Sequence, residues 1–397
     1  MKASITQKSK TSKRMKMSNN EAAQYSYVKR LVVKIGSSTL TADDGRLDAA
    51  YLQEMARQVA HLREQGTEVL IVSSAAIVAG LQRLNMPPER PGDIPTLQAA
   101  AAVGQIELAQ SYARAFAARG LTLGQILITR NDTTNREAYL HARDTLDRLL
   151  ELGVIPLVNE NDTIAIDEIR FGDNDTLAAQ VAILVKADLV VLLSDIDGLY
   201  TADPRLSEDA ELLEIVEEFT REIVEAAGSA GSEKGSGGMF TKLEAARMLM
   251  AASIPMVICE GHSEDAILNA ARGTLVGTRF ERETPGQHAK ARRLWLALSG
   301  TVCGTVTVDA GAVKALRERG GSLLPVGVVA MEGSFEKGSI VDIRDEEGLL
   351  IGRGISNYST DALEAAAGQR SESLIESAVV SDNAKTEVVH RDEMVIF

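Results

Sequence analysis

The sequence predicts an α/β protein with two folded domains, and two observations lead to that prediction. From residue 27 to about residue 280, short β-branched runs alternate with long helical segments, as in a three-layer αβα sandwich around a mainly parallel sheet. Beyond residue 300, short alternating runs punctuated by glycine favour a small β-barrel-like domain. We therefore divide the chain into a disordered basic tail (1–26), an α/β domain (27–280), a linker (281–298) and a C-terminal domain (299–397).

Composition narrows the class of protein. Of the 397 residues, 45% are hydrophobic and 25% are charged, which fits a soluble globular protein, and no apolar run is long enough to cross a membrane. A formal net charge of −14 argues against a nucleic-acid backbone as the main partner. The two cysteines, Cys259 and Cys303, lack the spacing of a metal site and are too few for a disulfide framework. A cytoplasmic location is therefore predicted.

The elements of the α/β domain follow from the period of the apolar residues. Apolar runs bounded by small or polar residues predict strands at 31–35, 68–73, 124–129, 155–158, 189–194 and 256–259. Helical periodicity predicts helices at 47–65, 97–118, 138–152 and 177–186. Because the strands read as continuous apolar runs, both faces of the sheet should be covered by helices. Ligands of such sheets bind beyond the carboxyl ends of the strands.

Polar residues gather at those strand ends. Lys34 lies at the end of the first strand, where a buried ammonium group is costly unless an anion meets it. Polar turns also follow the second, fourth and fifth strands, at 73–76, 159–162 together with 171–175, and 194–198. Each turn has a structural alternative, since Ser74 or Asp175 could cap a helix and Asp197 could form a turn. Their shared position on one rim favours a site for a polyphosphate, its Mg²⁺ and an amino-acid-like substrate.

A glycine-rich turn at 235–238 leads through Thr241 and Lys242 into a helical run at 243–252. Backbone N–H groups, the helix dipole and the Lys242 ammonium together predict a phosphate site. The spacing differs from the Walker pattern, so an ordinary P-loop is not implied. A flexible loop followed by a helix cap is the structural alternative.

Six segments of the α/β domain, in this order, resemble the amino acid kinase family: VVKIGSSTL, VGQIELAQ, VNENDTIA, FGDNDTLAAQVA, LLSDIDGLYTADPR and GSGGMFTKLEAA. In the C-terminal domain, VDAGAVKAL, SLLPVGVV, GSFEKGSIVDI and HRDEMVIF resemble the PUA domain. The resemblance implies the amino acid kinase fold and ATP-dependent phosphorylation of the side-chain carboxylate of L-glutamate, the first step towards proline. It also implies Mg²⁺ with the ATP, inhibition by proline, and a homo-oligomer, dimer or tetramer, built through the kinase domains.

The same resemblance implies the roles of individual residues. Lys34 and Lys242 are expected on the ATP phosphates and the transferred group, with Asp175 orienting both lysines. The glutamate-binding positions are Ser74, Asp162 and Asn174. The nucleotide-binding positions are Lys34, Gly36, Ser37, Ser194, Asp195, Ser236, Gly237, Gly238, Met239, Phe240, Thr241 and Lys242, and no residue is assigned as a metal ligand.

One position departs from the family pattern. Where the family usually has Ser-Gly-Ala after the second strand, this chain has Ser74-Ala75-Ala76. Ala75 is therefore expected either to narrow the approach to the substrate carboxylate or to take a backbone angle that suits glycine. Ser194 replaces a commoner threonine but keeps the hydroxyl.

The expected chemistry needs no general base. A glutamate side chain has an unperturbed pKa of ~4.3, so it is already ionised near neutral pH. The barrier is repulsion between two anions, which alignment and positive charge can lower. The five histidines all fall outside the motifs of the α/β domain, in agreement with this.

Two other functions remain open from the sequence. A kinase of the same fold could phosphorylate N-acetylglutamate or aspartate instead, and an RNA-binding regulator could have kept the scaffold without turnover. PUA domains often bind RNA, but acidic residues crowd 342–347. A structural or regulatory role is therefore predicted for this domain in preference to RNA binding.

Overall fold

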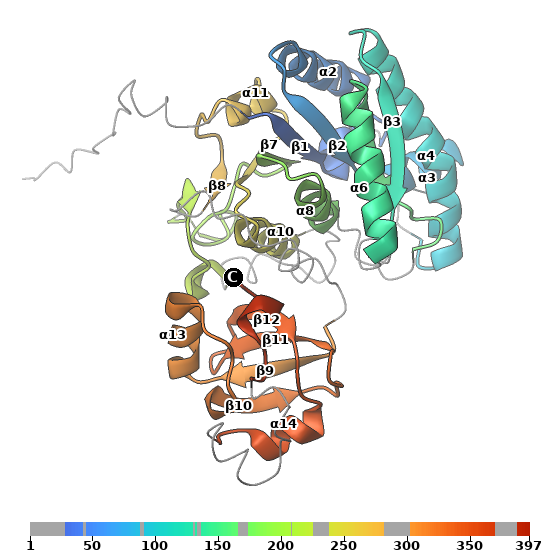
Figure 1. Cartoon of the computed structure of the whole chain (residues 1–397). Coiled ribbons are helices and arrows are strands. Elements are labelled where there is room, and N and C mark those ends of the chain that lie inside the picture. Colours follow the sequence, from blue (N-terminus) through green and yellow to red (C-terminus); the bar gives the residue numbers. More distant parts are fainter. Residues whose placement is uncertain are drawn as a thin grey trace, which may run out of the picture.

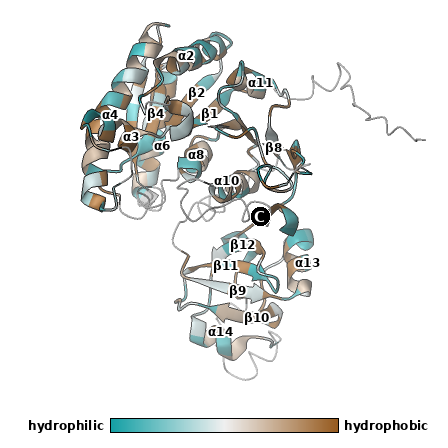
Figure 2. Ribbon diagram, turned by 180° about the vertical axis from the view of Figure 1, so that it is seen from behind, coloured by the Kyte–Doolittle hydropathy of each residue, from teal (hydrophilic) through white to brown (hydrophobic). Residues whose placement is uncertain are grey.

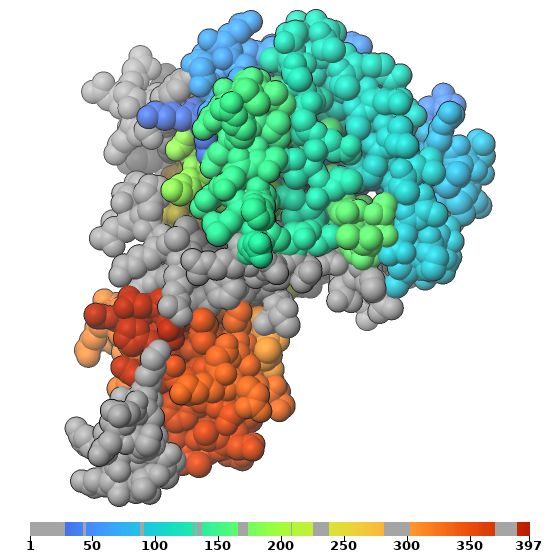
Figure 3. Space-filling view, turned by 45° about the vertical axis from the view of Figure 1, so that its right-hand side comes forward, coloured from blue at the N-terminus to red at the C-terminus, as the bar shows by residue number. Residues whose placement is uncertain are grey.

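The computed structural model describes residues 28–42, 45–87, 91–129, 132, 136–165, 174–207, 209–224, 238–281, 302–369 and 387–397. These residues form a larger part and a smaller part, one from each end of the chain (Figure 1). Figure 3 shows the larger part in blue to green and the smaller part in orange to red. The predicted tail lies outside the described residues, as does the predicted linker apart from Glu281.

An eight-stranded sheet organises the described residues of the larger part. Its strands are β1 (Arg30–Ile35), β2 (Glu68–Ser73), β3 (Leu123–Ile128), β4 (Ile155–Glu160), β5 (Leu189–Ser194), β6 (Ile215–Val216), β7 (Met256–Glu260) and β8 (Thr278–Phe280). Their order is β3-β4-β2-β1-β5-β7-β8-β6, and every neighbouring pair is parallel except β7 and β8. The predicted mainly parallel sheet is confirmed, and β6 and β8 are additions at its edge.

Helices cover both faces of this sheet (Figure 1). They are α1 (Ser37–Leu40), α2 (Ala49–Glu64), α3 (Ala76–Arg83), α4 (Ile94–Ala117), α6 (Arg136–Glu151), α8 (Asn174–Leu184), α10 (Met239–Ala251) and α11 (Ala266–Ala271). Residues of α6, α8 and α10 pack in one core, and residues of α2, α4 and α11 pack in the other. We call these sides the α8–α10 face and the α2–α11 face.

Strand alternation decides which face each side chain meets. In β1, Val32 belongs to the core of the α8–α10 face, whereas Leu31 and Val33 belong to the core of the α2–α11 face. Lys34 is two residues from Val32, so its side chain points to the α8–α10 face. Figure 2 shows the central strands mostly brown, with teal concentrated on the outer helices, as expected for a sheet buried on both sides.

Helices α3 and α4 cross in close contact because two glycines leave room. A Cβ built on Gly80 would lie 1.7 Å from the Ala100 carbonyl oxygen, and one on Gly104 would lie 1.7 Å from the Ala76 carbonyl oxygen. Any side chain at either position would therefore force the two backbones apart. This contact holds the start of α3, at the end of β2, against the body of the domain.

The smaller part is built on a five-stranded sheet in the order β10-β9-β11-β12-β13. Its elements are β9 (Gly304–Val308), α13 (Ala310–Arg319), η2 (Pro325–Gly327), β10 (Val328–Glu332), β11 (Ile340–Asp345), β12 (Leu350–Ile355), α14 (Thr360–Ala366), η3 (Arg391–Glu393) and β13 (Met394–Ile396). The alternating runs at 304–308, 327–331, 339–343 and 349–354 predict four strands, and β9, β10, β11 and β12 lie within two residues of those ends. The sequence prediction did not include β13 or the α-helices α13 and α14.

The two parts touch beside α10. Ala251, in the last turn of α10, packs with Val395 and Phe397, and Arg221 pairs with Glu347 at 2.7 Å. The C-terminus therefore lies between the two parts (Figure 1). Among the described residues, no helix has both the length and the apolar character required to cross a bilayer.

Candidate active site

Lys34 is a buried cation near the carboxyl end of a central strand. It lies next to the last residue of β1, opposite Val72 of β2 and Leu192 of β5. Only 7% of its surface is exposed. A buried ammonium group needs an anionic partner, and α8 supplies it.

Asp175 lies between two lysines. Its Oδ1 is 2.5 Å from Lys34 Nζ and its Oδ2 is 3.1 Å from Lys242 Nζ. The Thr241 hydroxyl also lies 3.0 Å from Oδ2. These side chains come from β1, α8 and α10, so the contact joins residues that are far apart in the sequence.

The starts of two helices explain how these groups meet. The predicted helix at 177–186 begins earlier, at Asn174, so Asp175 lies in the first turn of α8. The helical run predicted at 243–252 also begins earlier, at Met239, so Lys242 lies in the first turn of α10. A carboxylate is favourable at a helix N-terminus, whereas an ammonium group there opposes the helix dipole. The Asp175 carboxylate offsets that repulsion for Lys242.

The two lysines keep Asp175 ionised. Burial alone would raise the pKa of this carboxyl group, but the neighbouring Lys34 and Lys242 ammonium groups outweigh burial and lower the pKa to about 2. Near neutral pH the three groups carry two positive charges and one negative charge. The cluster therefore has an excess of positive charge in a buried place, which suits it to an anion such as a phosphate group.

A second polar group lies at the ends of β2 and β4. The Asn174 amide donates to the Ser73 carbonyl oxygen at 2.7 Å, to Ser74 Oγ at 3.0 Å and to Asn159 Oδ1 at 3.0 Å. Asn159 is 2% exposed, and its own Nδ2 is a buried donor without a hydrogen-bond partner among the described residues. A buried donor of this kind is costly unless a ligand accepts from it.

Asn159 is not among the site residues predicted from the sequence, although the polar turn that begins there is. The indication in the sequence is the position of Asn159, because it follows an apolar run at the predicted end of the fourth strand. The structure extends that strand to Glu160, so Asn159 lies inside β4 and its side chain is buried. We add Asn159 to the candidate site.

Ala75 takes the backbone conformation that its place in the sequence suggested. Its φ is 75° and its ψ is 6°, which is the left-handed region, and it precedes the first residue of α3. Glycine takes such angles at no steric cost, whereas alanine is strained there. The departure from Ser-Gly-Ala thus places a strained residue directly after Ser74.

Gly36 connects the end of β1 to the end of β5, where Ser194 lies. The Gly36 N–H donates to the Leu193 carbonyl oxygen at 3.3 Å, and the Ser194 hydroxyl donates to Asp195 Oδ1 at 3.1 Å. Gly36 has an ordinary φ of −72°, so its backbone angle does not require glycine. A Cβ there would lie 3.9 Å from Lys34 Nζ and would fill space beside that ammonium group.

The structure describes most of the other residues that the sequence predicts for the site. Gly238 precedes α10, Met239 is half-buried and Phe240 is 59% exposed at the start of that helix. Ser37 begins α1, and Asp162 is half-buried in the turn after β4. Ser236 and Gly237 lie outside the described residues. Within the described ranges, no three histidine, cysteine or acidic side chains are placed to hold a metal ion.

Comparisons with known proteins identify the family of this chain. The model of the amino acid kinase family matches residues 29–260, and that of the PUA domain matches residues 304–377. A glutamate 5-kinase of Citrifermentans bemidjiense is 44% identical over 369 residues, which are 93% of this chain and 98% of that protein. Those of Caldanaerobacter subterraneus (42%, covering 92% of this chain and 97% of that one) and Dehalococcoides mccartyi (43%, covering 93% and 98%) are similar over the same length.

The chain belongs to the glutamate 5-kinases of the amino acid kinase family. Its larger part is the amino acid kinase fold, and its smaller part is a PUA domain. Within that fold, the Lys34, Asp175 and Lys242 cluster lies at the carboxyl edge of the sheet, where parallel α/β proteins bind their ligands. Both predictions of family, the kinase and the PUA domain, are confirmed.

Proposed function

We propose that the protein transfers the γ-phosphoryl group of ATP to the side-chain carboxylate of L-glutamate. The product is L-glutamyl 5-phosphate, and the reaction is the first step of proline biosynthesis. The contact of Lys34 and Lys242 with Asp175 is the observation that carries this proposal. Membership of the glutamate 5-kinases supports the choice of glutamate as acceptor.

The reaction requires two anions to meet. A carboxylate oxygen of glutamate attacks the γ-phosphorus, the bond between that phosphorus and the oxygen of ADP breaks, and no proton needs to move. Lys34 and Lys242 contact different oxygens of the Asp175 carboxylate, and their excess positive charge can face the transferred group. In this proposal Asp175 is a positioning residue, because it holds both ammonium groups in place without touching the reacting atoms.

We assign the two substrates to the two sides of this cluster. Ser74, Asn174 and Asn159 at the ends of β2 and β4 would bind glutamate, and the unpaired Asn159 amide supports this because carboxylates accept hydrogen bonds. Asp162, in the turn after β4, stays a predicted glutamate ligand. Ser194, Asp195 and the start of α10 would bind the nucleotide, with backbone N–H groups directed at its phosphates.

Mg²⁺ would arrive with the nucleotide. This ion is usually held by one or two carboxylates together with substrate phosphates. When bound, it would neutralise phosphate charge. The exposed Asp195 carboxylate after β5 is the group that we assign to it.

The central test is ADP release measured with and without L-glutamate. We expect Lys242→Ala to lower the glutamate-dependent rate by roughly 10²–10³-fold, as for loss of one preorganised donor at a charged transition state. Lys314→Ala is a matched control because that lysine is exposed on α13 of the PUA domain. Equal rates in the parent and Lys242→Ala would contradict the assignment.

An acceptor panel separates the alternatives. The protein is incubated with ATP and L-glutamate, N-acetylglutamate or aspartate, and the acyl phosphate is trapped with hydroxylamine. Product with glutamate alone would support the proposal, and product with another acceptor alone would replace it. No product with any acceptor, together with an RNA gel shift that persists in Lys242→Ala, would favour an RNA-binding regulator.

Four further properties stay predictions. We expect inhibition by proline, a homo-oligomer formed through the kinase domains, a structural or regulatory PUA domain, and action in the cytoplasm. Both cysteines are free, Cys259 buried and Cys303 exposed, which is compatible with a reducing compartment. Rate measurements with added proline and the mass of the native protein in solution would test the first two.

A further inference from the structure

Gln105 is a buried glutamine of α4 whose amide reaches the end of β4. It is 7% exposed, and its Nε2 donates to the Glu160 carbonyl oxygen at 3.2 Å. Its Oε1 accepts from Gln125 Nε2 of β3 at 3.3 Å. A carbonyl oxygen can only accept, so the bond to Glu160 fixes which way the Gln105 amide points. Gln105 belongs to the segment VGQIELAQ, to which the proposed function gives no role.

The backbone of Glu160 needs partners from side chains because the pairing of β4 with β2 ends before it. The Asn161 N–H donates to the Ile128 carbonyl oxygen of β3. Successive backbone groups of a strand face opposite neighbours, so those of Glu160 face β2. The pairing of β2 with β4 ends at Val158, and buried backbone groups beyond that point must be satisfied in another way. Gln105 supplies the donor for the Glu160 carbonyl oxygen.

The N–H group of Glu160 is satisfied by a residue of the candidate site. It donates to Asn159 Oδ1 at 2.9 Å, and the Asn174 amide donates to the same oxygen at 3.0 Å. Because two donors meet Oδ1, the Asn159 Nδ2 is turned the other way, where it lacks a partner among the described residues. Gln105 thus holds in place the residue whose N–H group sets the direction of the Asn159 amide.

The neighbouring Gly104 brings α4 against the other half of the proposed glutamate site. A Cβ on Gly104 would lie 1.7 Å from the carbonyl oxygen of Ala76, the first residue of α3. Ser74 lies two residues before that point. Adjacent residues of α4 therefore contact both segments that carry the proposed glutamate ligands, the start of α3 through Gly104 and the end of β4 through Gln105.

We propose that Gln105 is a positioning residue for L-glutamate, which acts through the Glu160 backbone and the Asn159 side chain without touching the substrate. This inference rests on the proposed function, because it takes Asn159 as a ligand of glutamate. Without the Gln105 amide, the end of β4 loses a fixed position, and the Asn159 Nδ2 is no longer held toward the substrate. The affinity for glutamate should fall, whereas the lysine cluster and the nucleotide-binding residues should keep their places.

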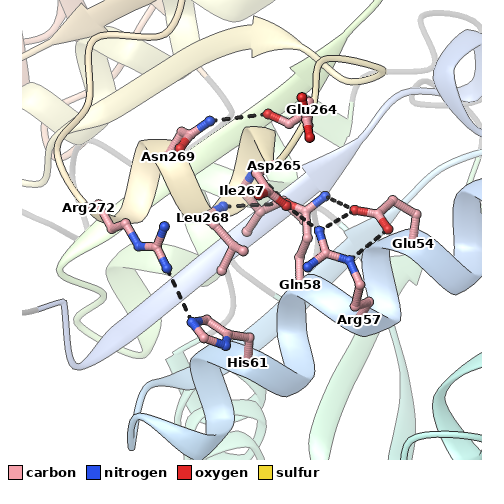
Figure 4. A network of polar contacts seen from close by, with 10 residues as sticks. All are labelled: Glu54, Arg57, Gln58, His61, Glu264, Asp265, Ile267, Leu268, Asn269 and Arg272. Atoms are coloured by element: carbon pink, nitrogen blue, oxygen red, sulfur yellow. Dashed lines mark hydrogen bonds and ion pairs between the residues drawn. The ribbon is translucent and has the colours of Figure 1, made fainter.

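A second buried glutamine provides a matched control. Gln58 of α2 is 5% exposed, and its Oε1 accepts from the Ile267 and Leu268 N–H groups at the start of α11 (Figure 4). Like Gln105, it satisfies backbone groups with its side-chain amide. Its bonds to these groups join α2 to α11 and involve none of the residues assigned to glutamate. Gln58→Leu should therefore lower the free energy of unfolding without changing the affinity for glutamate.

Steady-state ADP release, with each substrate varied in turn, tests the positioning role. We expect Gln105→Leu and Gln105→Glu to raise the KM for L-glutamate about three- to tenfold, as for loss of one hydrogen bond, with the KM for ATP unchanged. Gln105→Glu keeps an acceptor for Gln125, but its carboxylate cannot donate to Glu160. Calorimetric titration with L-glutamate should show the same fall in affinity. Gln110→Leu changes an exposed glutamine of the same helix and should leave both KM values unchanged.

The outcomes separate this inference from the proposed function. Equal glutamate affinity in Gln105→Leu and the parent, an equal rise in the KM for ATP, or the same loss of affinity in Gln58→Leu would each overturn the positioning role. Binding of glutamate to the parent without ADP release would contradict the proposed function alone, and no binding would overturn both. If neither Gln105 variant folds, Gln125→Leu on the exposed edge of β3 replaces them, and an unchanged glutamate affinity there would overturn the inference.

Discussion

The two faces of the large sheet bury polar groups in different ways. On the α8–α10 face, Lys34, Asp175 and Lys242 are ionised and lie within contact distance of one another. On the α2–α11 face, the hydroxyls of Thr39 and Tyr51 are buried without a partner among the described residues. A buried charge without a partner costs far more than a buried hydroxyl without one. The fold can therefore leave hydroxyls unpaired at modest cost, but it must bring charged groups together.

Asp175→Ala should produce the largest loss of stability, because it leaves two buried ammonium groups without their shared anion. Breaking a buried ion pair in this way costs about 3–5 kcal/mol. The free energy of unfolding is measured by urea titration, with Asp209→Ala as an exposed control in the same domain. A loss below about 1 kcal/mol would mean that water reaches the two lysines.

The pH dependence of stability also tests the ion pairs of Asp175. The pKa of Asp175 is lowered from 3.8 to about 2 in the folded protein, so its ionisation stabilises the fold at pH values above about 4. That contribution is lost as the pH falls from about 4 through 2, because the folded state must then take up a proton. We expect the stability difference between the parent and Asp175→Asn to shrink over this window. Urea titrations between pH 5 and pH 2 measure it, and a constant difference would contradict the pairing.

Ala75→Gly should act in the opposite direction, because it removes backbone strain at a residue in the core of the α2–α11 face. The left-handed conformation costs alanine about 1–2 kcal/mol, and part of the gain is cancelled by the extra freedom of glycine in the unfolded chain. A net stabilisation of about 1 kcal/mol is expected. Ala79→Gly, in the interior of α3, is the matched control and should destabilise by a similar amount. A loss of stability in both variants would show that the backbone of Ala75 is not strained.

The sheet was the most predictable feature of this chain. Its central strands are continuous apolar runs, and in β2 and β5 the predicted bounds agree with the structure. The edge strands β6 and β8 escaped prediction because they have two and three residues, too short for a period to be visible. In the PUA domain, α13 was missed although Asp309 caps it and Gly320 ends it, because the glycine-punctuated pattern around it favoured strands.

The candidate site was predictable in its residues but not in its contacts. The strand ends indicated Lys34, and the glycine-rich turn indicated Lys242, but nothing in the sequence shows that both meet Asp175. That contact depends on where α8 and α10 begin, and the positions of helix ends are set by tertiary packing. The hydrogen bond from Gln105 to Glu160 left no signal in the sequence either, because it joins α4 to the end of a strand 55 residues further along the chain.

The smallest expected effects come from two tyrosines on the α2–α11 face, and they test the comparison directly. Tyr112 is fully buried, and its hydroxyl forms a 3.0 Å hydrogen bond with Ser73 Oγ, whereas the Tyr51 hydroxyl has no described partner. Tyr112→Phe should therefore lower the free energy of unfolding by roughly 0.5–1 kcal/mol, the net value of one neutral hydrogen bond. Tyr51→Phe should leave it unchanged or raise it slightly, because it removes a buried group whose hydration was lost without compensation. The same substitution in both positions, measured by urea titration, makes each variant the control for the other. Equal losses would show that the Tyr51 hydroxyl is already bonded in solution.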